Sequence, residues 1–347
     1  MVLLMYPTSR ELVKKILQTY GVPEWVEVLE VREVKGTLVI TVLDRPDKTA
    51  VIGVGGRLVA SLARELDVRA VYVVAATDLM VTKIRVARAL RKLESIVKNL
   101  AGEGNKILLL LKECATKRLK DPVGWVEQVF SNLKKNLDEE VESACVSLSG
   151  GIDSLATTLI LLSIGIRPIT VTVNPGPIIL PSKQISIIEK ACKAVKVKNV
   201  FINPVDAQEF AENIKLALSG LRHPCKKCSE IIKKSVVEWA KDKGFKVVFF
   251  GSLLPTGGFS IDDSRDEVLV IHLPAMLALT KGLTSYITRS VLGNLKPYPY
   301  GCPLLTECNR RYKSMKLVSI KRLLKKVRAG VIEPAEALKK LKFILYA

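Results

Sequence analysis

Residues 145–157 read CVSLSGGIDSLAT. A short apolar run leads into two adjacent glycines between hydroxyl side chains, and Asp153 follows them. Adjacent glycines let backbone N–H groups approach a ligand closely, and the hydroxyls of Ser149 and Ser154 add donors at the same point. A loop of this kind between a strand and a helix N-terminus binds anions. The stretch therefore predicts a phosphate-binding loop within an α/β fold.

The surrounding region has the pattern of a parallel sheet. From residue 141 onward short apolar runs alternate with helical patterns, and the expected strands are ACVSL, PITVTV, NVFIN and KVVFF. Apolar strands separated by helices are typical of a parallel sheet covered on both faces. Ligands of such sheets bind beyond the carboxyl ends of the strands, where this glycine loop lies.

The segment SGGIDS at 149–154 resembles the PP-loop of the N-type ATP pyrophosphatase superfamily, whose pattern is S-G-G-x-D-S. It matches neither G-x-x-x-x-G-K-S/T, because no Lys follows the glycines, nor G-x-G-x-x-G. The resemblance implies an adenine nucleotide α-hydrolase-like parallel-sheet domain that binds ATP and transfers AMP to a substrate oxygen. Asp153 would then hold Mg²⁺ or orient the phosphates.

Further nucleotide-binding positions follow from their place in the implied fold. TVNPG at 172–176 ends the second strand, where adenine sits in that superfamily, and FFGS at 249–252 ends a later strand, near the ribose and phosphates. The residues implied to bind the cofactor are Ser147, Ser149, Gly150, Gly151, Asp153, Ser154, Val173, Gly251 and Ser252.

Composition points to a polyanionic partner. The chain has 347 residues, 48% of them hydrophobic, which is enough for two or three domains with real cores. Its 54 Lys and Arg against 34 Asp and Glu give a net charge of +20. We therefore expect nucleic acid as a partner, because phosphate contacts by basic residues release counterions. A solvated surface like that of a thermophile's protein is the alternative.

The N-terminus MVLLMYPTSRELVKK has an apolar start that Pro7 interrupts, which is too short for a signal peptide. No apolar run approaches the roughly 20 residues that span a bilayer. We expect a cytoplasmic protein without a membrane partner. Its seven cysteines should then be mostly reduced, so a close cysteine pair indicates metal or redox chemistry before a structural disulfide.

Residues 1–77 form the first predicted module. A helix capped by Thr8 and Glu11 comes first, and the strands WVEVLEV and TLVITVL follow it, with a turn at Lys35–Gly36 between them. After them come the strand TAVI, a glycine loop, a helix and another strand. The loop Gly53-Val54-Gly55-Gly56 with Arg57 resembles the Gly-x-x-Gly loop of KH domains, which clamps about four nucleotides. The resemblance implies an α+β RNA-binding domain in which Gly53, Gly56 and Arg57 contact RNA. The alternative is an ordinary glycine turn in a small α+β domain.

The remaining organisation has three parts. A helical connector at 78–140 contains a basic helix at 79–100, the segment KILLLLKECATKRLKD, whose pattern fits strand or helix, and the amphipathic helix PVGWVEQVFSNLKKNL. The PP-loop domain with its cysteines covers 141–309, and a basic helical tail covers 310–347. In that tail Leu317, Ile320, Leu324 and Val327 form the predicted apolar face, and Lys321, Arg322, Lys325, Lys326 and Arg328 lie largely elsewhere as a phosphate-facing surface.

Two cysteines stand at the start of a predicted helix, in HPCKKC at 223–228. The helix dipole and the neighbouring Lys226 and Lys227 favour their thiolates. Cys302 and Cys308 lie far along the chain in YPYGCPLLTEC. The other three cysteines, Cys114, Cys145 and Cys192, lie in apolar surroundings typical of a core.

C-x-x-C followed by a helix, a strand and a distant cysteine resembles the tRNA 2-thiolation enzymes of the PP-loop superfamily. That resemblance implies that Cys225, Cys228 and Cys302 hold a [4Fe–4S] cluster and, with Asp153, are catalytic. Cys308 would replace Cys302 or be a fourth ligand, and four thiolates would equally suit structural zinc. Persulfide relay through a cysteine pair is a third alternative.

One feature departs from those enzymes. Many of them follow the late strand with a short loop that ends in two acids, whereas here a longer insertion precedes Asp262 and Asp263. These acids either reach the active site or belong to a solvated loop. Lys233 and Lys234 would approach ATP or the base, or lie on the surface.

The function predicted from all of these features is that of an ATP-dependent tRNA sulfurtransferase. Its partners would be tRNA and a sulfur donor, either sulfide or a sulfur-carrier protein, and the sequence is compatible with a homodimer. The competing hypotheses are a small-molecule ligase or nitrile-forming enzyme with structural zinc, similar to the deazaguanine synthases; an enzyme like the sulfonucleotide reductases; and a non-catalytic RNA-binding protein that senses nucleotide.

Overall fold

The computed structural model describes residues 10–34, 36–98, 103–136, 143–263 and 268–346. The chain divides into two compact units, residues 1–84 and 85–347. Within the described residues, none of the helices combines the length and the hydropathy that crossing a bilayer would require. The predicted cap residue Thr8 and turn residue Lys35 lie outside the described residues.

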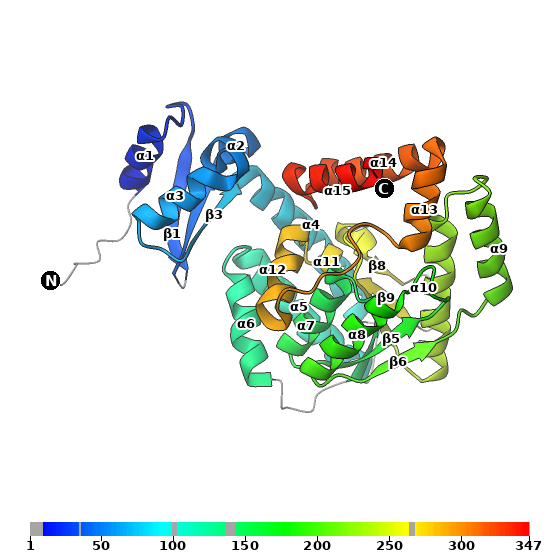
Figure 1. Cartoon of the computed structure of the whole chain (residues 1–347). Coiled ribbons are helices and arrows are strands. Elements are labelled where there is room, and N and C mark those ends of the chain that lie inside the picture. The colour runs from blue at the N-terminus through cyan, green and yellow to red at the C-terminus, as the bar shows by residue number, and fades with distance from the viewer. Residues whose placement is uncertain (1–9, 35, 99–102, 137–142, 264–267, 347) are drawn as a thin grey trace. The chain divides into compact units, whose positions relative to one another are not determined.

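The first unit contains a three-stranded sheet in the order β1-β2-β3 with helices packed on it (Figure 1). β1 and β2 are antiparallel and β2 and β3 are parallel. The core of this unit includes Val13, Leu38, Ile40 and Leu62, all of which are fully buried. Its elements are α1 (Arg10–Thr19), β1 (Val28–Val34), β2 (Thr37–Val42), α2 (Arg45–Ile52), η1 (Val54–Gly56), α3 (Arg57–Glu65) and β3 (Ala70–Ala75).

The segment before the glycine loop is helix α2, so the predicted strand TAVI is wrong. The Asp44 side chain accepts a hydrogen bond from the Asp47 N–H at 3.2 Å, which caps the helix. Pro46 lies in the first turn, where its missing N–H costs no hydrogen bond. These start signals outweigh the strand preference of the following residues, and the glycine loop consequently joins two helices.

The second unit is built on a six-stranded sheet in the order β6-β5-β4-β7-β9-β8, in which β8 alone is antiparallel to its neighbour. The four predicted strands are β4 to β7, and the parallel arrangement is confirmed. β9 and the short β8 were not predicted. The strands are β4 (Ser143–Ser147), β5 (Arg167–Val173), β6 (Asn199–Ile202), β7 (Val247–Phe250), β8 (Ile261–Asp262) and β9 (Leu269–His272).

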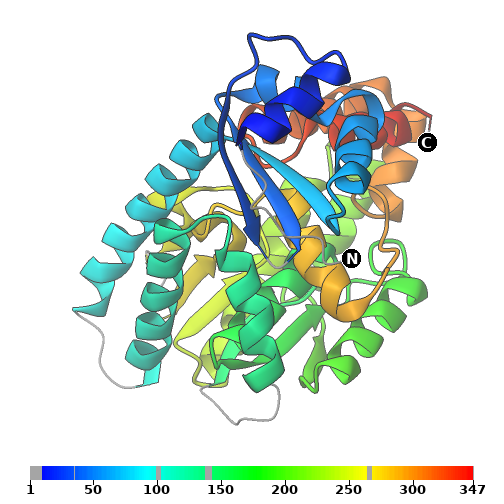
Figure 2. The same ribbon diagram turned by 90° about the vertical axis from the view of Figure 1, so that its left-hand side faces the viewer.

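Helices cover both faces of this sheet. Cys145, Val248 and Val270 point to the face covered by α10, and Val146, Phe249 and Ile271 point to the face covered by α7 and its neighbours. The segment KILLLLKECATKRLKD lies in α5, which packs along the C-terminal half of α4 (Figure 2). The helices are α4 (Ala76–Val97), α5 (Glu103–Lys120), α6 (Trp125–Asn136), α7 (Ile152–Ser163), α8 (Ser182–Ala194), α9 (Ala207–Leu218), α10 (Cys225–Asp242), α11 (Leu273–Met276) and α12 (Lys281–Leu292).

Three C-terminal helices pack on one another, with α13 beside α9 (Figure 1). They are α13 (Pro303–Arg311), α14 (Lys313–Arg328) and α15 (Pro334–Tyr346). The predicted apolar face of α14 is wrong in part: Leu317 and Leu324 are half exposed, whereas Met315, Ser319 and Leu323 are buried. A buried serine on this face indicates that α14 packs against polar groups.

Candidate nucleotide and thiol site

The loop at 148–151 joins β4 to α7 at the centre of the sheet. From β4 the chain passes to β5 on one side and later returns to β7 on the other, so the loop lies where the strand order reverses. Such a switch point opens a crevice beyond the strand ends. The first N–H groups of α7 also lack partners within the helix and therefore suit an anion.

Hydrogen bonds within the loop hold it in shape. The Ser154 hydroxyl donates to the Gly151 carbonyl at 2.9 Å and accepts from the Ser149 N–H at 3.3 Å. Gly150 has a φ of 68°, and a side chain there would collide with Gln184, whose amide donates to the Ser149 carbonyl at 3.3 Å. Ser154 is therefore a loop-closing residue, while Ser149 is exposed.

Gly251 lies against the same loop from the end of β7. A Cβ at this position would be 2.5 Å from the Ser154 nitrogen and 2.8 Å from the Asp153 carbonyl carbon. Only glycine allows the end of β7 to approach the helix start this closely. We therefore assign Gly251 to the construction of the loop, with half-buried Ser252 following it.

Asp153 is held by two residues that the sequence did not predict. Its Oδ1 accepts from the Lys281 ammonium at 2.8 Å and from the Thr284 hydroxyl at 2.7 Å. Both lie in the first turn of α12, 128 and 131 residues further along the chain. Their spacing of three residues places them on one helix face, but only the fold brings that face to Asp153.

The predicted adenine-side residues lie at the ends of central strands. The Val173 side chain is buried in the core shared with α10. Asn174 then starts a turn by accepting a hydrogen bond from the Gly176 N–H at 3.1 Å. Ser147 is half-buried near the end of β4.

The three predicted ligand cysteines lie at two helix N-termini. Cys225 and Cys228 are in the first turn of α10, and Cys302 is the N-cap of α13. All three are half-buried free thiols. Cys302 contributes to the raised pKa of both Cys225 and Cys228, so the three thiols belong to one region of the structure.

Burial controls the ionisation of these thiols. It raises the pKa of Cys225 to about 11 and that of Cys228 to about 12, and it also raises the pKa of Cys302, which the backbone amides of Leu305 and Leu304 partly oppose. The prediction that the dipole and neighbouring lysines favour thiolates is therefore wrong, and Lys227 is committed to an ion pair with Glu209.

Cys308 belongs to the core. It is fully buried with Leu304 and Met315, and its S–H donates to the Ala217 carbonyl at 3.5 Å. Burial raises the pKa of Cys308 to about 11. This environment favours a packed neutral thiol over a ligand.

The donor groups of this site are of the kinds that bind metals. Thiols from two helix N-termini suit iron–sulfur or zinc ligation, which requires their deprotonation. Asp153 offers one carboxylate, which is enough for Mg²⁺ when nucleotide phosphates supply further oxygens. Over the described part of the chain, no three His, Cys, Asp or Glu side chains already stand together as a metal site. The side chains would therefore have to converge on binding.

A hydrogen-bonded chain connects the cysteines to α14. The Cys225 N–H donates to His223 Nδ1 at 3.4 Å, and His223 Nε2 lies 3.3 Å from the Ser319 hydroxyl. Ser319 in turn donates to Asn309 Oδ1 at 2.9 Å. Burial, reinforced by Arg322, lowers the pKa of His223 to about 4, so the imidazole is neutral.

The two acids after the late strand are committed elsewhere. Asp262 pairs with Lys233 at 3.1 Å and Asp263 with Lys92 at 2.7 Å. β8 is antiparallel to β9 and its Asp262 is opposite Val270, so β8 leads the chain away from the carboxyl ends of the parallel strands, where the glycine loop lies. Lys234 pairs with Asp206 at 2.8 Å. Asp263 and Lys234 therefore lie on the surface, whereas Lys233 and Asp262 form a half-buried pair with each other.

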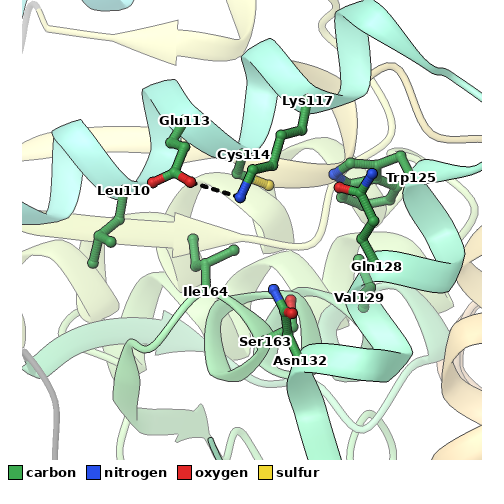
Figure 3. A pocket seen from close by; sticks show the side chains of 10 residues that line it. All are labelled: Leu110, Glu113, Cys114, Lys117, Trp125, Gln128, Val129, Asn132, Ser163 and Ile164. Carbon is green, nitrogen blue, oxygen red and sulfur yellow. Dashed lines mark ion pairs between the residues drawn. The ribbon is translucent and has the colours of Figure 1, made fainter. Parts of the chain in front are cut away.

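A small hollow of about 130 Å³ lies at the other end of α7 (Figure 3). Cys114, Trp125 and Ser163 line it, and an ion pair of 2.6 Å joins Glu113 to Lys117 at its edge. The length of α7, about 18 Å, separates it from the glycine loop. The hollow is therefore not part of the nucleotide site.

Comparison with known proteins finds remote similarity. No family model matches the chain. An uncharacterised protein of Methanocaldococcus jannaschii is 28% identical over 230 residues, which cover 63% of this chain and 85% of that protein. A second uncharacterised protein of the same organism is 29% identical over 152 residues, which cover 43% of this chain and 52% of that protein.

Two solved structures resemble this chain with low TM-scores and low sequence identity. One is the U34-tRNA thiolase NcsA from Methanococcus maripaludis with its [4Fe–4S] cluster, with 15% identity, a TM-score of 0.39, and coverage of 63% of this chain and 78% of that chain. The other is the NAD⁺ synthetase from Burkholderia pseudomallei, with 17% identity, a TM-score of 0.30, and coverage of 64% and 90%.

Proposed function

We propose that this protein is an ATP-dependent tRNA sulfurtransferase. In the proposed reaction a nucleobase carbonyl oxygen attacks the α-phosphorus of ATP and releases pyrophosphate. Sulfide then attacks the carbon of that carbonyl group, the C–O bond breaks, and AMP leaves with the oxygen. With sulfide the exchange is redox-neutral, and the remaining proton goes to solvent.

The observation that carries this proposal is the pairing of an anion-binding loop with a set of three thiols. The loop supplies helix N–H groups for phosphates, and Asp153, fixed by Lys281 and Thr284, lies at its edge. Cys225, Cys228 and Cys302 gather at two other helix starts. An enzyme that only hydrolysed ATP would not need that thiol set.

Each group has a role in the proposed reaction. Ser154 and Gly251 keep the loop in the shape that receives phosphates, and Asp153 orients them or binds Mg²⁺. The three cysteines would hold a [4Fe–4S] cluster, which supplies a place for sulfur when bound. Structural zinc on the same thiols is the alternative that metal analysis decides.

RNA binding is assigned to the basic surface and to the first unit. In its glycine loop Gly53, Gly55 and Gly56 have positive φ, Val54 is 87% exposed, and nothing lies within 4 Å of a Cβ built on Gly55. An open backbone followed by exposed Arg57 is suited to clamping phosphates in the manner of KH domains. The charge of +20 supports a polyanionic substrate.

The test is a reconstituted reaction. Anaerobically purified protein receives ATP, Mg²⁺, sulfide and tRNA, and nucleosides are analysed by mass spectrometry beside AMP and pyrophosphate. We expect a thionucleoside in amounts equal to AMP. Cys225→Ala should abolish it together with bound metal, whereas Cys192→Ala, which removes a buried thiol of α8, should retain both.

The outcomes separate the hypotheses. AMP formed with a small acceptor but never with tRNA would replace the sulfurtransferase by a ligase, most clearly if the protein holds zinc and no iron. ATP binding without any AMP production would point to nucleotide sensing. Either result overturns the proposal.

A further inference from the structure

Helix α14 is attached to residues of the candidate site at its middle and just beyond its C-terminus. At the middle Ser319 is bonded to His223, two residues before Cys225, and its carbonyl accepts from the Tyr300 hydroxyl at 3.1 Å. Beyond the C-terminus the Val331 carbonyl accepts from the Lys281 N–H at 2.7 Å. Lys281 is the residue whose ammonium holds Asp153. The helix therefore spans from the thiols to the glycine loop.

The face of α14 between these attachments carries two cations. Arg322 and Lys326 follow Ser319 by three and seven residues, so all three lie on one side of the helix. The distance along the axis from Ser319 to Lys326 is about 10 Å. Arg322 lies close enough to His223 and Cys225 to affect their ionisation, and Lys326 interacts electrostatically with Asp153.

Lys326 is a half-buried cation in a cationic environment. Burial lowers its pKa; Asp153 opposes this, and Lys281, Arg322 and Lys340 lower the pKa further. Asp153 is already bonded to Lys281, and Lys340 to Glu336. The Lys326 ammonium makes no hydrogen bond or ion pair with another residue that the structure describes, and only the backbone carbonyl of this residue is bonded, to the Val331 N–H at 3.1 Å. A buried positive charge without a bonded partner is costly unless an anion joins it.

We propose that Lys326 binds the phosphates of the nucleotide at the glycine loop, so that α14 forms one wall of the ATP site. This inference rests on the proposed use of ATP and adds a residue that the loop motif does not contain. The anion would complete the charge balance of Lys326 and Lys281 around the single carboxylate of Asp153. Because α14 also bonds to His223, the same wall continues to the thiols.

The competing explanation is that Lys326 only balances the charge of Asp153. In that case its removal would change stability but would not change phosphate affinity. The two explanations differ in the salt dependence of nucleotide binding, because a direct phosphate contact contributes to that dependence.

The experiment measures the dissociation constant of an α,β-methylene analogue of ATP by calorimetry at two salt concentrations. Lys326→Met keeps most of the aliphatic stem and removes the charge, Lys326→Arg keeps the charge, and Lys313→Ala removes an exposed charge from the same helix. Thermal unfolding of each variant checks folding. We expect Lys326→Met to weaken binding about 10- to 100-fold and to reduce the salt dependence, with the other two within about threefold of wild type.

Two results would overturn the inference. If wild type binds the analogue and Lys326→Met binds it equally well, Lys326 is not a phosphate ligand, while the proposed use of ATP stands. If wild type itself does not bind the analogue, the proposed function fails first and the inference fails with it. A loss confined to Lys326→Met, with rescue by Lys326→Arg, supports it.

Discussion

Replacement of Gly251 by alanine tests whether close packing behind the glycine loop sets its shape. The added Cβ would lie 2.5 Å from the Ser154 nitrogen, 2.6 Å from its Cα and 2.8 Å from the Asp153 carbonyl carbon. All three are backbone atoms, so no side chain can rotate away. Ordinary contact begins near 3.4 Å, so β7 and the start of α7 must separate by roughly 0.9 Å.

The size of the effect follows from that displacement. Overpacking of this kind lowers the free energy of unfolding by about 1–3 kcal/mol. A shift of about 1 Å in groups that position a substrate can cost about 100-fold in rate. We therefore expect Gly251→Ala to weaken binding of an ATP analogue by tenfold or more and to reduce AMP formation by about 100-fold.

The assay pairs calorimetric binding with urea unfolding. Gly258→Ala is the matched control, because its Cβ would meet nothing nearer than the Arg88 carbonyl oxygen at 3.9 Å and its φ is ordinary. Equal analogue binding and equal stability in Gly251→Ala and wild type would refute the claim that this contact shapes the loop.

Three further predictions concern other charged groups. Lys281→Ala should weaken analogue binding several-fold by freeing Asp153, while the isosteric Lys281→Met should do the same without a cavity; unchanged binding in both would contradict the role of this pair. Arg57→Ala should reduce the slope of log tRNA affinity against log salt by about 0.9, and exposed Arg64→Ala should not if the glycine loop is the contact. Hydrogen bonds from Arg310 and Arg311 lower the pKa of Glu307 to about 2. The stability advantage of wild type over Glu307→Gln should therefore be full above pH 4.5 and should vanish as the pH falls through 2. A difference in the free energy of urea unfolding that stays the same at every pH would exclude this.

The central sheet could be predicted because its strands are short, apolar and separated by helices. β9 carries the same short apolar pattern in LVIH at 269–272 and could have been predicted from it. α2 was assigned as a strand from its branched residues, and the Asp44 cap outweighed them. An apolar run therefore indicates a buried strand, but it misleads where a capping residue starts a helix in the same segment.

The site was predicted in part for a similar reason. The glycine loop and the C-x-x-C pair are contiguous in sequence and could be recognised, and the loop follows a central strand at its carboxyl end, as expected. Lys281 and Thr284 could not be found, because their relation to Asp153 exists only after folding. The buried face of α14 differs from the predicted apolar face, because the helix buries Ser319 and half-buries Lys326. A periodicity of apolar residues cannot indicate a buried face that contains polar side chains.

The double attachment of α14 has a consequence for biosynthesis. About 170 residues separate the glycine loop from Lys326, so a ribosome making 5–20 residues per second needs about 9–35 s between them. During that interval the emerging sheet can close around its loop while the wall that carries Lys326 is still being made. The nascent chain thus presents the glycine loop uncovered, and the proposed ATP site is completed only when the last helices fold.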